Sequence, residues 1–149
     1  LVMGLWANSG KTLKDTVRIR TRHTTLEVFF YSLSGLSALW ASCQTDIFYG
    51  VAAASPSVWF PGFVEYLKER KIKSRSVYLS LGNKEEKTKN SVMSKVGDCI
   101  RELYAWMQAE EIQCTLEWNQ GGHFKDPTLR VAKAFAWVSN TENEKGRNG

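Results

Sequence analysis

The chain alternates between short apolar segments and longer segments in which apolar residues recur every three or four positions. Short segments rich in β-branched and aromatic residues predict strands, and the three-to-four spacing predicts helices. We expect strands over residues 25–31, 49–55, 75–82 and 112–119, and helices over residues 33–43, 61–71, 91–111 and 127–137. Asp126 and Pro127 fit the N-cap and the first turn of the last helix.

Strand and helix therefore alternate four times, with short connections. Such alternation favours right-handed crossovers and predicts an α/β fold with a parallel sheet of about four strands, flanked by helices. Residues 1–24 show no strand or helix periodicity, residues 25–140 form the predicted folded unit, and residues 141–149 are a polar tail. Because ligands bind at the carboxyl ends of parallel strands, we expect the functional site there.

Composition narrows the functional classes. With 149 residues the chain suits one domain, and no apolar run is long enough for a membrane span. The first residues lack the features of a secretory signal. The net charge of +5 is concentrated in residues 1–30 without any nucleic-acid motif. Three cysteines at no metal-ligand spacing predict buried thiols in a reducing compartment. We expect a cytoplasmic protein with no metal, nucleic-acid or membrane partner.

Residues capable of acid–base or nucleophilic catalysis follow three of the predicted strands. Ser32 ends the first strand, Glu85 and Glu86 follow the third, and His123 follows the fourth. A serine hydroxyl is a poor nucleophile until an imidazole, held in one tautomer by a carboxylate, accepts its proton. The chain order of serine, acid and histidine is the order that α/β-hydrolases use. These residues therefore predict a serine hydrolase site.

Four motifs strengthen this prediction. They are "YSLSGLSALW", "AAASPSVW", "YLSLGNKEEKTKN" and "LEWNQGGHF". Together they resemble a bacterial esterase family of α/β-hydrolases that includes siderophore esterases and is related to S-formylglutathione hydrolases. The resemblance extends from Tyr31 to about Val138. It implies a partial α/β-hydrolase fold, a small-molecule ester substrate and no cofactor.

Carried over by position, the resemblance makes Ser32 the nucleophile and His123 the general base. The backbone N–H of Leu33 becomes one oxyanion donor.

The acid is Glu85, three residues after Gly82, or alternatively Glu86. Trp59, which follows the second strand, is a candidate wall of the substrate pocket.

Each residue also has a structural alternative. Ser32 could cap the following helix, and His123 could be an ordinary histidine of a surface loop. Glu85 and Glu86 could be first-turn acids that favour a following helix through its dipole. These alternatives stay open on the residues alone.

The sequence departs from the family at and before the serine. Phe30 stands where the Gly-x-Ser-x-Gly elbow has its first glycine, so we expect it to distort the turn or tip Ser32 out of line. The family expects further strands and a second oxyanion donor upstream, for which thirty residues leave too little room. We therefore expect an incomplete or frame-altered gene product, with a free edge on strand 25–31 that invites self-association.

Two functions remain. The first is a serine ester hydrolase that forms an acyl-enzyme and is weakly active. The second is a non-catalytic remnant of the fold that serves as a binding or vestigial module.

Overall fold

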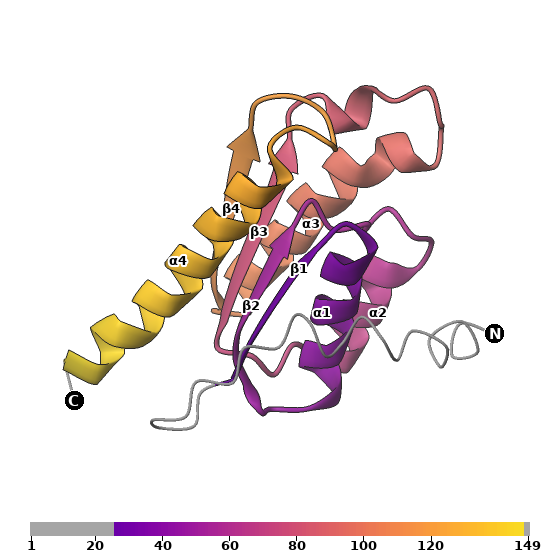
Figure 1. Cartoon of the computed structure of the whole chain (residues 1–149). Helices are drawn as coiled ribbons and strands as arrows, with labels where there is room; N and C mark the ends of the chain where they lie inside the picture. The colour runs from indigo at the N-terminus through magenta and orange to yellow at the C-terminus, as the bar shows by residue number, and fades with distance from the viewer. Residues whose placement is uncertain (1–25, 148–149) are drawn as a thin grey trace, which may run out of the picture.

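The computed structural model describes residues 26–147 and shows a parallel four-stranded sheet with helices on both faces (Figure 1). The strands are β1 (Leu26–Tyr31), β2 (Phe48–Ala54), β3 (Ser76–Gly82) and β4 (Gln113–Asn119). The α-helices are α1 (Leu33–Gln44), α2 (Phe63–Arg70), α3 (Val96–Ala109) and α4 (Pro127–Arg147). Two short 3-10 helices, η2 (Glu85–Lys87) and η3 (Met93–Lys95), lie between β3 and α3. The predicted N-terminal segment 1–24 lies outside the described residues.

The strands are arranged in chain order, β1-β2-β3-β4, and each adjacent pair is parallel. Phe30 pairs with Ala53, Ala53 with Leu79, and Leu79 with Leu116, so the register runs evenly across the sheet. The predicted α/β fold with about four parallel strands is confirmed. Within residues 26–147, β1 and β4 are the two edges of the sheet. All four strands therefore deliver their carboxyl ends, and the loops that follow, to one end of the molecule.

The helices divide between the two faces of the sheet. Helices α1, α2 and α3 cover one face, and α4 is the described helix that crosses the other (Figure 1). The larger core lies on the three-helix side, where Leu39, Leu67 and Leu103 are fully buried. On the other side, Ala134 and Val138 of α4 pack against β2 and β3. A Cβ on Gly50 would lie 2.2 Å from Val138 Cγ1, so glycine is what permits this close approach.

Two predicted helix boundaries are wrong. The helix expected over residues 91–111 begins as an α-helix at Val96, because Asn90 Oδ1 accepts the N–H groups of Val92 and Met93 and stabilises a separate turn first. The last helix begins at Pro127 as predicted, with the Asp126 carbonyl accepting the Arg130 N–H, but it continues past residue 137 to Arg147. The glutamates and lysine of its polar end are good helix formers.

The three cysteines lie on the predicted elements and are free thiols. Cys43 is on α1, Cys99 on α3 and Cys114 on β4. Burial raises the pKa of all three thiols, to about 11 for Cys43. They are therefore protonated near neutral pH and are poor nucleophiles. Of the helices in residues 26–147, none is long and apolar enough to cross a membrane.

Candidate active site

Ser32 stands alone between the last residue of β1 and the first residue of α1. Its backbone has φ 60° and ψ −125°, a conformation that L-residues rarely adopt. Three hydrogen bonds hold this turn in place. The Ser32 N–H donates to the Ala54 carbonyl at 3.1 Å, and the Ser32 carbonyl accepts the N–H groups of Leu36 at 3.2 Å and Ser57 at 3.1 Å. The turn therefore matches the strained strand-to-helix elbow that exposes a nucleophile in α/β-hydrolases.

The Ser32 hydroxyl is directed at the histidine and does not cap the helix. Its Oγ lies 2.9 Å from His123 Nε2, and it makes no capping hydrogen bond to α1. The helix-cap alternative for Ser32 is therefore wrong. The expectation that Phe30 tips Ser32 out of line is also wrong, since the hydroxyl lies within hydrogen-bond distance of the imidazole. The three backbone hydrogen bonds of the turn explain why Ser32 keeps this position.

His123 belongs to the loop between β4 and α4. Its Nδ1 lies 2.7 Å from Glu85 Oε2, and its side chain is 28% exposed. The ring is flanked by Tyr31, at a centroid distance of 5.2 Å, and by Phe124, at 5.0 Å and nearly perpendicular. The Tyr31 hydroxyl donates a hydrogen bond to the His123 carbonyl oxygen. His123 is therefore fixed on several sides, unlike an ordinary histidine of a surface loop.

Glu85 begins the short helix η2, directly after β3. Its side chain is 5% exposed, and both oxygens are fully engaged. Oε2 faces His123, whereas Oε1 accepts the Gly82 N–H at 2.7 Å, the Ser55 hydroxyl at 2.8 Å and an Arg130 N–H at 2.8 Å. A Cβ on Gly82 would lie 2.4 Å from the Gly121 carbonyl oxygen. A glycine is therefore required where the acid turn and the histidine loop meet.

The electrostatics of Glu85 determine the tautomer of the imidazole. Burial alone would raise the pKa of this carboxyl, but hydrogen bonds from His123, the Gly82 N–H and Ser55 outweigh burial and lower the pKa below its usual value. Glu85 is therefore a carboxylate near neutral pH and can only accept hydrogen bonds. The proton between the two side chains then belongs to His123 Nδ1, which leaves Nε2 as an acceptor for the Ser32 hydroxyl.

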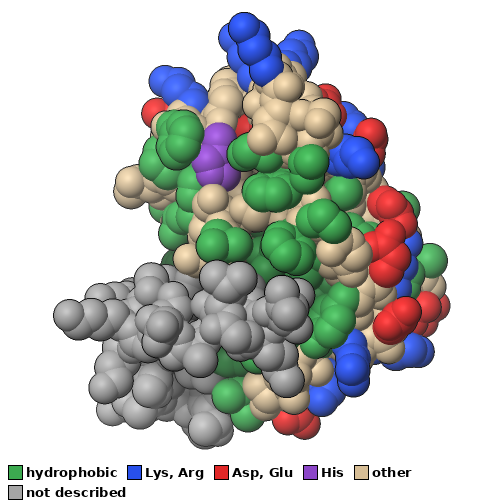
Figure 2. Space-filling model, turned by 90° about the vertical axis from the view of Figure 1, so that its right-hand side faces the viewer, with side chains coloured by type: hydrophobic (Ala, Val, Ile, Leu, Met, Phe, Trp, Pro, Cys, Tyr) green, Lys and Arg blue, Asp and Glu red, His purple; other side chains and the backbone are tan. Residues whose placement is uncertain are grey.

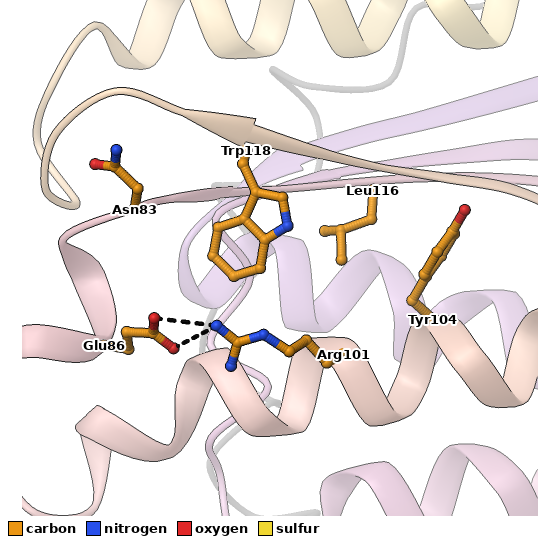
Figure 3. A pocket seen from close by; sticks show the side chains of 6 residues that line it. All are labelled: Asn83, Glu86, Arg101, Tyr104, Leu116 and Trp118. Carbon is orange, nitrogen blue, oxygen red and sulfur yellow. Dashed lines mark hydrogen bonds and ion pairs between the residues drawn. The ribbon is translucent and has the colours of Figure 1, made fainter.

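Glu86, the alternative acid, lies elsewhere. Its two oxygens accept hydrogen bonds from Arg101 Nη2 at 2.9 and 3.0 Å. Both residues border an open hollow of about 610 Å³ at the β4 edge, which Trp118 and Tyr104 also line (Figure 3). Arg101 stacks on Trp118 and also pairs with Asp98, so its charge is already balanced. None of the residues that line the hollow belongs to the Ser32–His123–Glu85 group.

Two further predicted residues lie in segments that adjoin Ser32. Leu33 is the first residue of α1, so its N–H has no partner within the helix and is free to bind an anion. Trp59 lies in the loop that begins with Ser55 and is partly buried against the main core. The N–H of Ser57 in this loop donates to Ser32, which places the loop beside the elbow.

Sequence reasoning missed Arg130, Ser55 and Tyr31. Arg130 is 1% exposed and lies in the first turn of α4. A signal for it was present, because Arg130, Ala134 and Val138 recur every four residues and form one buried face of the helix. An arginine on an otherwise apolar helix face indicates a buried partner. Ser55 and Tyr31 carried no comparable signal, since serine in a loop and tyrosine in a strand are common.

The surface around the serine and histidine is apolar. Leu33 is 59% exposed, Phe124 is 88% exposed and Phe60 is 40% exposed. Figure 2 shows the described histidine on this face, with hydrophobic side chains beside it. Among residues 26–147, no group of three or more histidine, cysteine, aspartate or glutamate side chains is arranged to hold a metal ion.

Comparisons with known proteins bear on the fold. No protein-family model matches the chain. No curated protein sequence matches it either. Among solved structures, the chain is similar to the siderophore hydrolase EstA from Aspergillus nidulans, with a TM-score of 0.56 and 22% sequence identity. The similarity covers 77% of this chain and 48% of EstA, so the chain spans about half the length of that protein. The fold of this chain therefore resembles part of an α/β-hydrolase.

Proposed function

We propose that this chain is a serine hydrolase that cleaves esters of small molecules, as in the esterase family that its motifs resemble. One observation carries the proposal: an unbroken line of hydrogen-bonded atoms runs from Ser32 Oγ through both ring nitrogens of His123 to the Glu85 carboxylate. Ser32 is the nucleophile, His123 the general base and Glu85 the acid that orients it. The similarity to EstA, which is a siderophore hydrolase, supports the same class of chemistry.

Acylation follows from this geometry. Ser32 Oγ attacks the ester carbonyl carbon while His123 Nε2 accepts the hydroxyl proton. The resulting imidazolium is stabilised by the Glu85 carboxylate at Nδ1. The negative charge moves to the carbonyl oxygen, where the Leu33 N–H can donate a hydrogen bond. Collapse of this intermediate breaks the ester C–O bond. The alcohol leaves with the proton from His123, and the acyl group stays on Ser32.

Deacylation repeats the same steps with water. His123 Nε2 accepts a proton from a water molecule that attacks the acyl carbon. The bond to Ser32 Oγ then breaks, Ser32 takes the proton back and the carboxylic acid is released. No step needs a cofactor, and the three side chains return to their starting protonation states.

The surface beside the triad indicates the substrate class. Leu33 follows the nucleophile, Phe124 follows the base, and both side chains are largely exposed. Phe60 extends from the loop that contacts the elbow. An apolar acyl group would cover these side chains and gain about 25 cal/mol for each Å² of apolar surface removed from water. We therefore expect medium-length acyl esters to be preferred to acetyl esters.

The second candidate function is a non-catalytic module. It is favoured because the motifs imply one oxyanion donor in this part of the chain, the Leu33 N–H, where complete enzymes of the fold use two. The chain also spans about half of EstA. Loss of one oxyanion donor typically costs about 10²–10³-fold in rate, so turnover by this chain is expected to be slow. A slow enzyme and a non-catalytic module can be distinguished by whether Ser32 is acylated at all.

A burst experiment tests acylation independently of turnover. The chain is mixed with excess p-nitrophenyl butyrate, and release of p-nitrophenol is followed from the first seconds. We expect a burst that approaches one p-nitrophenol per chain, followed by a slow phase. Ser32→Ala should abolish the burst, whereas Ser34→Ala, two residues away in α1, should retain it. If the folded wild-type chain releases p-nitrophenol no faster than Ser32→Ala, or Ser32→Ala keeps the burst, the non-catalytic function replaces this proposal.

A further inference from the structure

Arg130 is a buried cation that the hydrolytic mechanism does not use. It is the largest fully buried side chain among those that the structure describes, with 1% of its surface exposed. It lies on the buried face of α4, where Ala134 and Val138 occupy the next two turns. Burying a guanidinium is costly unless its charge and its N–H groups find partners. The partners of Arg130 therefore indicate what this side chain does.

These partners lie on both sides of the acid–histidine hydrogen bond. Nη1 donates to Glu85 Oε1 and to the Ser55 hydroxyl, each at 2.8 Å. Nη2 donates to the carbonyl oxygen of Gly122 at 2.9 Å, and Gly122 is the residue directly before His123. One planar group therefore binds the acid through one nitrogen and the histidine loop through another.

We propose that Arg130 is a positioning residue that holds Glu85 and the His123 loop at the separation their hydrogen bond requires. This inference rests on the proposed function, since the acid–histidine pair is what it positions. Arg130 makes no contact with Ser32 or with the apolar surface that would receive an acyl group. It acts through Glu85 and His123, and it should therefore affect the chemical step and leave substrate binding unchanged.

The geometry of the guanidinium explains why arginine is needed here. Its two terminal nitrogens lie in one plane and point at separate acceptors. A lysine carries the same charge, but it has one nitrogen in place of the two coplanar terminal nitrogens that bind Glu85 and Gly122. Arg130→Lys should therefore keep the ion pair with Glu85 and release the loop at Gly122. A misplacement of about 1 Å in a catalytic group can cost ~10²-fold in rate.

Ser55 and Tyr31 also help to hold Glu85 and the His123 loop in place. The Ser55 hydroxyl donates to Glu85 Oε1 and accepts from Arg130, while the Ser55 backbone has φ 47°. Tyr31 binds the His123 carbonyl, one residue beyond the carbonyl that Arg130 binds. The acid and the histidine loop are thus held by groups from β1, the end of β2 and α4. Arg130 is the member that binds both.

The first test measures the rate at which Ser32 reacts. The rate of Ser32 labelling by a fluorophosphonate probe is measured over a range of probe concentrations. We expect Arg130→Lys to lower the maximal labelling rate by ~10–10²-fold with the half-saturating concentration unchanged. The matched control is Lys133→Met, about one turn further along α4. It removes an exposed cation and its ion pair with Glu117, and it should change neither value. An unchanged maximal rate in Arg130→Lys overturns the inference.

The second test separates positioning from folding. If Arg130 acts by aligning the charged Glu85–His123 hydrogen bond, its removal should cost nothing further once Glu85→Gln has removed that charged hydrogen bond. The double variant Glu85→Gln/Arg130→Met should therefore label as slowly as Glu85→Gln alone. This double variant buries no unpaired charge, so it also covers the case in which Arg130→Met by itself fails to fold. A further loss of ~10-fold or more in the double variant would assign Arg130 a role outside the acid–histidine pair.

The third test does not depend on activity. The chain has two histidines, so in a His23→Gln background the hydrogen-bonded Nδ1–H proton of His123 can be followed alone by NMR. We expect this signal in the parent and in Ser32→Ala, and its loss or exchange broadening in Arg130→Lys. If the probe does not label the wild-type chain but this signal behaves as expected, the proposed function fails and the positioning role of Arg130 stands. If the signal is unchanged in Arg130→Lys, the positioning role of Arg130 is contradicted, whatever the labelling result.

Discussion

Glu85 and Glu86 are adjacent in the chain, yet their carboxylates bind partners on different elements, the loop after β4 and helix α3. Glu85 accepts from His123 Nδ1 at 2.7 Å, while Glu86 accepts from Arg101 Nη2 at 2.9 Å. The sequence left the choice of acid between these two residues open. The structure gives one of them a contact with the imidazole and gives the other a surface ion pair.

This contrast provides a matched pair of substitutions. Glu85→Gln should slow fluorophosphonate labelling of Ser32 by ~10³–10⁴-fold, because an amide can favour the wrong imidazole tautomer and cannot stabilise an imidazolium. Glu86→Gln removes the same charge one residue later and should leave the rate within about threefold, since exposed ion pairs contribute little. Circular dichroism verifies folding of both variants. Equal effects from the two substitutions would contradict the assignment of Glu85 as the acid.

The lowered pKa of Glu85 predicts a stability difference with pH. The folded chain binds the Glu85 proton less tightly than the unfolded chain does. The stabilisation from Glu85 is therefore fully present above the ordinary value of 4.5 and is lost as the pH falls through the lowered folded value. Urea unfolding from about pH 7 to about pH 3 measures this loss. The variant Glu85→Gln/Arg130→Met should lose less stability over this range than the wild-type chain, and parallel curves would contradict the prediction.

The structure changes the expected effect of replacing Phe30. If Phe30 distorted the turn, as the sequence predicts, Phe30→Gly would relax the elbow and increase activity. Because Ser32 already lies 2.9 Å from His123 Nε2, we now expect no increase in labelling. Glycine inside β1 should instead lower the free energy of unfolding by about 0.5–1 kcal/mol through the added backbone freedom of the unfolded chain. Urea unfolding and probe labelling check the two parts, and a clear increase in labelling would restore the strain hypothesis.

The fold was largely predictable from sequence, for physical reasons. In a parallel sheet both faces of a strand are covered, so β2 and β3 appear as continuous apolar runs such as "GVAAA" and "VYLSLG". The parallel arrangement of the strands followed from the alternation with helices, and Ser32 and His123 were found because they lie just beyond the ends of strands. Glu85 was found because a glycine stands three residues before it.

Other features depend on tertiary contacts that no local pattern encodes. The buried Arg130 is explained by Glu85 and Gly122, which lie far from it in the chain. The delayed start of α3 depends on the side chain of Asn90, and the left-handed backbone of Ser55 depends on its place beside the acid. The effect of Phe30 was misjudged because two of the three hydrogen bonds that hold the Ser32 turn come from β2 and the loop after it.

The free edge of β1 predicts self-association. Within residues 26–147, β1 pairs with β2 alone, and no described strand pairs with the N–H and C=O groups on its other side. Such an edge invites pairing with another chain. The alternative that residues 1–24 cover this edge lies outside the described residues. Size-exclusion chromatography with light scattering over a concentration series should show dimers or larger species that dissociate on dilution. A monomer at all concentrations would show that this edge is protected.

The central claim is that Ser32 is an activated nucleophile, and the most direct measurement is the location of its covalent adduct. The folded chain is treated with a fluorophosphonate probe, digested and analysed by peptide mass spectrometry. We predict one adduct per chain, on Ser32, lost in His123→Ala and retained in Ser34→Ala. The account would be contradicted by an unmodified Ser32 in the folded chain, or by adducts spread over other serines at the same rate.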